Sequence, residues 1–98
     1  MRIEIPHDKI HDFCLKWGVR EFSIFGSSLR DDGHSESDVD ILVSFHDETS
    51  WGLFEFFDMI DELQEIFGRK VDLVEKEALR NPIRKSEILS QRRVVYAA

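Results

Sequence analysis

FGSSLRDDGHSESDVDILVSF, residues Phe25 to Phe45, is the stretch around which the rest of this sequence is organised. Apolar residues alternate along its second half, at Val39, Ile41, Val43 and Phe45. This period of two predicts a strand over residues 38–45 with one buried face. Asp38 and Asp40 then lie together on the opposite face, with Cα atoms about 6.5–7 Å apart. The strand therefore begins with a pair of neighbouring carboxylates.

The paired carboxylates indicate a site for divalent metal. Two carboxylates at this separation can reach one cation, or two cations about 3.5–4 Å apart. Without a cation they repel, because like charges on one face of a sheet are destabilising. Gly26-Ser27 directly follows a strand predicted over residues 19–25. A turn of small residues, leading into a short helical turn over 28–30, lets backbone N–H groups and the Ser27 hydroxyl approach an anion.

The combination of these two features resembles the signature of the minimal nucleotidyltransferases. These are small members of the DNA polymerase β-like nucleotidyltransferase superfamily. Their pattern of Gly-Ser, ten residues and Asp-x-Asp is matched here by Gly26-Ser27 and Asp38-Val39-Asp40. The expected order of helices and strands fits the family over nearly the whole chain.

Two further residues extend the resemblance. Arg30 is similar to an arginine that follows Gly-Ser by three positions in many members, and Asp72 is similar to a third carboxylate on a later strand. Taken alone, a carboxylate inside a short apolar strand is costly unless it is paired, so Asp72 could equally form a salt bridge with an arginine. One departure is Asp31-Asp32, where many members have a glycine soon after the arginine.

The resemblance implies Mg²⁺-dependent transfer of AMP from ATP to an acceptor hydroxyl. It assigns Asp38, Asp40 and Asp72 as catalytic residues and as ligands of two Mg²⁺ ions, and Gly26, Ser27 and Arg30 as nucleotide-binding residues. The acceptor that the family implies is a tyrosine of a HEPN-domain toxin, which would make this chain an antitoxin. Two alternatives remain: a non-catalytic antitoxin or nucleotide sensor that acts by contact, and a transferase for a small molecule of the aminoglycoside type.

The whole chain is expected to form one α+β domain, residues 1–98. The family implies a small mixed sheet with helices mainly on one face.

The sequence pattern predicts the remaining elements. Helices are expected over 7–17, over 51–67 and from Asn81-Pro82 to about 90. A third strand is expected over 69–74, and an edge strand or a tail at 94–96. Thr49 or Ser50 is the expected N-cap of the second helix. Its stripe of Leu53, Phe56, Phe57, Ile60, Leu63 and Phe67 is assigned to the core.

Composition narrows the classes of function. A net charge of −7 argues against general nucleic-acid binding. The charge is uneven, since residues 1–68 hold 5 Lys/Arg and 16 Asp/Glu, whereas residues 69–98 hold 8 and 4. The C-terminal third could therefore face phosphates or an acidic partner, or be an ordinary solvated surface. No apolar run is long enough to span a membrane, no signal core precedes the domain, and the lone Cys14 agrees with a cytoplasmic protein.

Overall fold

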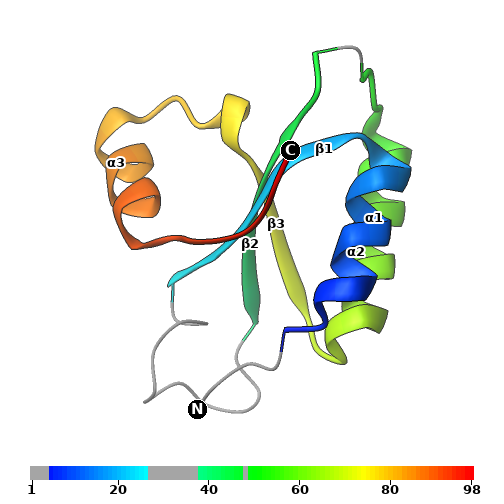
Figure 1. Ribbon diagram of the computed structural model, residues 1–98. Coiled ribbons are helices and arrows are strands. Elements are labelled where there is room, and N and C mark those ends of the chain that lie inside the picture. The colour runs from blue at the N-terminus through cyan, green and yellow to red at the C-terminus, as the bar shows by residue number, and fades with distance from the viewer. Residues whose placement is uncertain (1–4, 27–37, 48) are drawn as a thin grey trace.

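The computed structural model describes residues 5–26, 38–47 and 49–98, which form one layered α+β unit (Figure 1). In chain order the elements are α1 (His7–Trp17), β1 (Val19–Phe25), β2 (Val39–Phe45), α2 (Leu53–Phe67), β3 (Val71–Glu75), the 3-10 helix η2 (Lys76–Ala78), α3 (Pro82–Gln91) and β4 (Arg93–Ala97). The predicted fold class is confirmed.

The four described strands form one mixed sheet in the order β3-β2-β1-β4. β2 pairs with β3 in parallel, while β1 is antiparallel to both β2 and β4. The parallel pair is connected through α2, which is the crossover helix that a parallel connection requires. The segment at 94–96, predicted as an edge strand or a tail, is part of edge strand β4.

Two layers of helices cover the sheet (Figure 1). α1 and α2 pack on one face, where they enclose the larger core with Phe13, Phe22, Ile41 and Leu63 among its members. α3 covers the other face, where Ile88 packs against Phe25 and Leu42. Two of the three described helices thus share a face, as expected. The apolar stripe of α1 is buried as predicted, including Cys14, whose thiol has its pKa raised to about 12 by burial.

The start of α2 differs from the prediction. The helix begins at Leu53 and its N-cap is Gly52, so the expected N-caps Thr49 and Ser50 are wrong. The Thr49 hydroxyl is already engaged, because it donates to the carbonyl of His46 at 2.8 Å. The N-terminal end of α2 is instead closed by Glu55, whose carboxylate accepts from the Gly52 N–H at 2.8 Å. Asn81 is confirmed as the N-cap of α3, accepting from two backbone N–H groups of the first turn.

The core assignment on α2 is also partly wrong. Met59 and Leu63 are fully buried and set the inward face of the helix. Leu53 and Phe57 lie outside this face and are exposed, although the helical stripe assigned both to the core. A stripe drawn through every large apolar residue is wider than the sheet can cover, so its edge remains in solvent.

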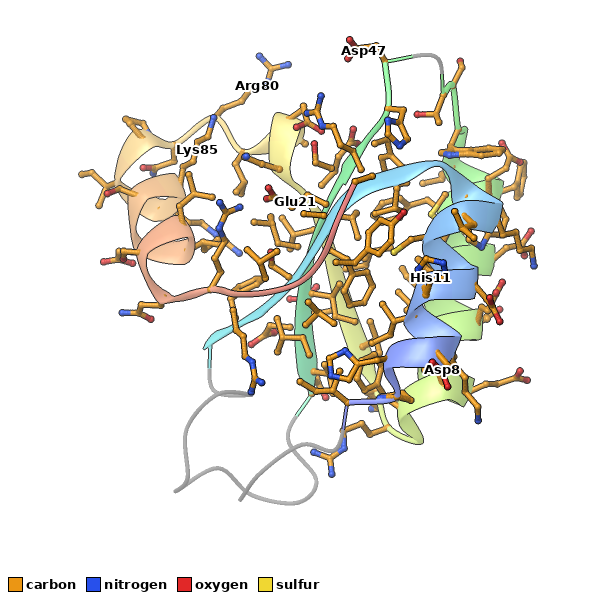
Figure 2. The ribbon with its side chains drawn as sticks, in the orientation of Figure 1. Asp8, His11, Glu21, Asp47, Arg80 and Lys85 are labelled. Atoms are coloured by element: carbon orange, nitrogen blue, oxygen red, sulfur yellow. The ribbon has the colours of Figure 1, made fainter. Side chains whose placement is uncertain are left out.

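The sheet face under α3 also carries polar contacts. Glu21 on β1 lies on this side of the sheet, as Figure 2 shows, and pairs with Arg92 and, at 3.7 Å, with Lys76. Ser44 is buried on the same face and donates to Glu77 at 2.7 Å. Within the described ranges, no helix is both long and apolar enough to cross a membrane.

A matched pair of leucines tests the packing. Leu63→Ala on α2 should lower the free energy of unfolding by about 2–5 kcal/mol, because Leu63 has 0% of its surface exposed and its removal leaves a cavity. Leu15→Ala removes the same atoms from α1, but at a position that is 63% exposed, so its effect should stay within about 0.5 kcal/mol. Urea denaturation measures both values. Equal losses would contradict this arrangement of the core.

Candidate active site

Three segments that are distant in sequence meet at one end of the sheet. β1 ends at Phe25, and β2 and β3 begin at Val39 and Val71. Because β1 runs antiparallel to β2, its last residue lies opposite Asp40. Because β2 and β3 are parallel and in register, Asp40 is the direct neighbour of Asp72. The fold therefore brings Gly26 and two of the predicted carboxylates to one place.

Asp40 and Asp72 point to the same face of the sheet. Neighbouring residues on paired strands share a face and lie about 4.8 Å apart. Their strand neighbours Leu42 and Val74 belong to the cluster under α3, which identifies this as the α3 face. Asp38 precedes Asp40 by two positions and lies just before β2 begins. Of the three carboxylates that the sequence grouped, Asp40 and Asp72 are thus direct neighbours across the sheet, and Asp38 lies two positions before Asp40.

The surroundings of Asp40 shift the pKa of its carboxyl group. Burial, and then the charges of Asp72 and Asp38, raise the pKa of the Asp40 carboxyl above its usual value, while the charge of Arg84 opposes that shift. Asp38 and Asp72 are exposed, whereas Asp40 is half-buried. The expectation that Asp72 would be a costly carboxylate inside an apolar strand is therefore wrong, because its side chain reaches solvent at the strand's start.

Gly26 lies directly against the carboxylate of Asp40. Its φ of +71° is a left-handed conformation, and a Cβ at this position would lie 2.5 Å from Oδ2 of Asp40. The sequence predicted that this glycine belongs to a turn that lets backbone N–H groups approach an anion. In the structure the first atom that an added side chain would meet belongs to a carboxylate of the predicted metal site. The turn and the carboxylate are therefore packed together.

Part of the predicted site lies outside the described residues. This applies to Ser27 and Arg30, to the helical turn expected over 28–30, and to the loop expected over 31–37. Their assignment as nucleotide-binding residues stays a prediction from the sequence.

The acidic group fits Mg²⁺ by its chemistry. In the described part of the chain, no three His, Cys, Asp or Glu side chains are gathered closely enough to hold a metal ion as they stand. Mg²⁺ does not require such a cage, since it is usually bound through one or two carboxylates together with the phosphates of a substrate. Asp40 with Asp72 or Asp38 supplies this number of hard oxygen ligands.

Arg84 is a residue of this site that the motif did not identify. It lies in the first half of α3, four positions before the buried Ile88, so both side chains lie on the same side of the helix. Its charge acts on Asp40, yet its side chain is exposed and forms no ion pair with a described residue. The net positive charge of residues 69–98 indicated that this part of the chain could face phosphates. It could not identify which arginine lies near the carboxylates.

Comparisons with known proteins agree with this arrangement. A family model described as a nucleotidyltransferase domain matches residues 8–95. The protein adenylyltransferase MntA of Thermococcus cleftensis is 41% identical over 81 residues, which cover 83% of this chain and 77% of that protein.

Solved structures share the fold at lower sequence identity. A toxin–antitoxin crystal structure with AMP-PNP superposes with a TM-score of 0.77 at 18% identity, over 96% of this chain and 75% of that chain. A structure of the tri-AMPylated HEPN toxin of Shewanella oneidensis in complex with its MNT antitoxin gives 0.67 at 17% identity, over 94% and 70%. At these identities, the likeness establishes the fold.

Gly26→Ala tests whether the close contact between Gly26 and Asp40 matters for nucleotide binding, apart from its effect on stability. A residue with a Cβ in the left-handed region costs about 1–2 kcal/mol, and Gly68→Ala, at φ +69° with no atom within 4 Å of the added Cβ, is the matched control. The Asp40 carboxylate can rotate away from the new Cβ, so the two variants should lose similar stability in urea. Only Gly26→Ala should weaken binding of Mg²⁺–ATP, measured by calorimetry. Equal nucleotide affinity in both variants would contradict the role of this contact.

Asp40→Asn should reveal the repulsion among the carboxylates. A carboxyl with a raised pKa in the folded state opposes folding when it is ionised, so stability decreases as the pH rises through that pKa. In metal-free buffer at pH 7, Asp40→Asn should therefore melt at the same temperature as the parent or higher. This difference should shrink as the pH is lowered towards the usual range of aspartate, because protonation then neutralises Asp40 in the parent. Asp12→Asn, on α1, is the control; a large loss of stability in Asp40→Asn would show a structural role instead.

Proposed function

This chain belongs to the nucleotidyltransferase domain family, and we propose that it transfers AMP from ATP to a hydroxyl group of an acceptor protein. Its relative MntA carries the name protein adenylyltransferase. Proteins of the same fold have been solved with an ATP analogue and with an AMP-modified HEPN toxin. These relatives support a tyrosine of a HEPN-domain toxin as the acceptor and the role of antitoxin for this chain.

The observation that carries the proposal is the register between β2 and β3, which sets Asp40 beside Asp72. In this proposal Asp38 and Asp40 hold the Mg²⁺ of the triphosphate, and Asp72 shares a second Mg²⁺ with them. Bound Mg²⁺ would supply charge stabilisation for the attacking and leaving oxygens. The half-buried Asp40 is the central ligand, because both other carboxylates act on its charge.

The nucleotide is held from two sides in this proposal. Gly26 and Ser27 receive the β- and γ-phosphates through backbone N–H groups and the serine hydroxyl. Arg30 assists by neutralising phosphate charge. Arg84 approaches from α3 and adds a second cation near Asp40. The acidic site thus acquires positive groups where the triphosphate enters.

The proposed reaction is an in-line displacement at phosphorus. The acceptor's hydroxyl oxygen forms a bond to the α-phosphorus, and the bond from that phosphorus to the bridging oxygen breaks. Pyrophosphate leaves with the electron pair, and Asp72 accepts the proton of the hydroxyl. The exposure of Asp72 supports this role, since a side chain of another protein can reach it. The need of this reaction for ATP agrees with the cytoplasmic location expected from the sequence.

Asp72→Asn tests the proposed function. If Asp72 acts chiefly in the transition state, the variant should bind Mg²⁺–ATP nearly as well as the parent, while transfer falls by orders of magnitude. The measurement pairs calorimetry of Mg²⁺–ATP with incorporation of label from [α-³²P]ATP into the purified HEPN-domain acceptor.

The control is Asp12→Asn, which removes an exposed carboxylate from α1 on the other face of the sheet; it should leave both quantities unchanged. If Asp72→Asn still silences the toxin without transferring label, inhibition acts by contact alone, and the proposal of an enzyme fails.

A further inference from the structure

The start of α2 exposes four large apolar side chains within seven positions. They are Trp51, Leu53, Phe54 and Phe57, with 41%, 66%, 80% and 52% of their surfaces exposed, and we call them the α2 apolar patch. Single exposed apolar residues are normal on a protein surface, but a group of this size marks a surface for interaction. The α2 apolar patch is therefore the strongest unassigned feature among the described residues.

One residue of the α2 apolar patch, Trp51, is anchored to α1. The indole N–H of Trp51 donates to the carbonyl of Trp17 at 2.7 Å, and the two rings pack edge to face at 5.1 Å. Behind the patch, Met59 and Leu63 lock the inward face of the helix in the core. An anchored side chain such as that of Trp51 loses little conformational entropy when a partner binds, which favours binding.

The acidic residues around the α2 apolar patch indicate the charge of the surface that would bind it. The sequence has no Lys or Arg between Arg30 and Arg69. Asp58, Asp61 and Glu65 follow Phe54 along the outer side of α2 and are all exposed. If two copies of this chain met symmetrically through the patch, these acidic residues would face each other and repel. The surface that fits combines apolar side chains with Lys or Arg.

We propose that the α2 apolar patch is the docking surface for the acceptor protein, which meets it with apolar side chains flanked by Lys or Arg. The identity of the occupant rests on the proposed function, because only that function requires an acceptor protein. The surface itself is defined by its exposure and its charge.

The α2 apolar patch lies far from the carboxylates of the candidate active site. α2 begins at the end of the domain opposite the one where β2 and β3 begin (Figure 1). The seven residues of β2 correspond to about 23 Å between these ends. Asp72 lies on the α3 face, whereas α2 covers the other face of the sheet, so an acceptor docked at the patch must extend round the domain to reach Asp72. A folded acceptor domain, about 30 Å across, is large enough to do so. Loss of the patch should therefore weaken acceptor binding and raise the KM for the acceptor, without changing nucleotide affinity.

The test is a double substitution in the α2 apolar patch. Phe54→Ser with Phe57→Ser should lower the affinity for the purified HEPN-domain acceptor by at least about tenfold, measured by calorimetry. Mg²⁺–ATP affinity and the melting temperature should remain at the parent's values, because neither side chain supports the core or the site. Leu15→Ser, at a position 63% exposed on α1, is the matched control and should bind the acceptor like the parent.

A second variant tests the charges. Asp58→Lys with Asp61→Lys should also weaken acceptor binding, and added salt should weaken the parent's binding more than this variant's. Equal acceptor affinity of the parent and the Phe54/Phe57 variant would overturn the inference and leave the proposed function intact. A parent dimer in light scattering that this variant dissociates would overturn it in favour of a second copy. A parent that neither binds nor modifies the acceptor would overturn the proposed function, and the inference with it.

Discussion

The parallel ladder between β2 and β3 is the constraint on which the rest of the structure depends, because it also sets Asp40 beside Asp72. Two carboxylates on neighbouring strands repel each other, and this repulsion increases where burial lowers the local dielectric. The parallel ladder from Val39 to Val43 holds them in register, and the crossover through α2 makes that parallel ladder attainable. Apolar packing on one face of the sheet thus maintains an arrangement that the charges on the other face oppose.

The direction of the strands explains why one end of the sheet carries the site. An antiparallel β1 must end where β2 begins, and a parallel β3 must begin there too. Gly26, Asp40 and Asp72 come from three separate segments and consequently lie at a common position. α3 closes over the same face through Ile88 and brings a cation, Arg84, towards this acidic end.

The parts that the sequence predicted well are those that local pattern determines. Alternation identified β2, because short-range geometry controls it. The spacing from Gly26 to Asp40 matched a family pattern, and these two residues lie side by side in the structure, whereas the roles assigned to them stay predictions. The exposure of Leu53 and Phe57 was not predictable from helical periodicity, since it depends on how much of α2 the sheet can cover. The N-cap at Gly52 was missed because the hydroxyl of Thr49 is used in the preceding turn. Arg84 was missed because its relation to Asp40 exists only once α3 has packed.

The burial of Cys14 has a practical consequence for labelling chemistry. With its pKa raised to about 12, only roughly one thiol in 10⁵ is a thiolate at pH 7, and the thiolate is the reactive form. The side chain is also enclosed between α1 and the sheet, with 1% of its surface exposed. Towards maleimides and similar probes, the folded chain therefore behaves as if it had no cysteine. A single cysteine introduced at the surface would carry a fluorophore or spin label at a unique position, with the native thiol left in place.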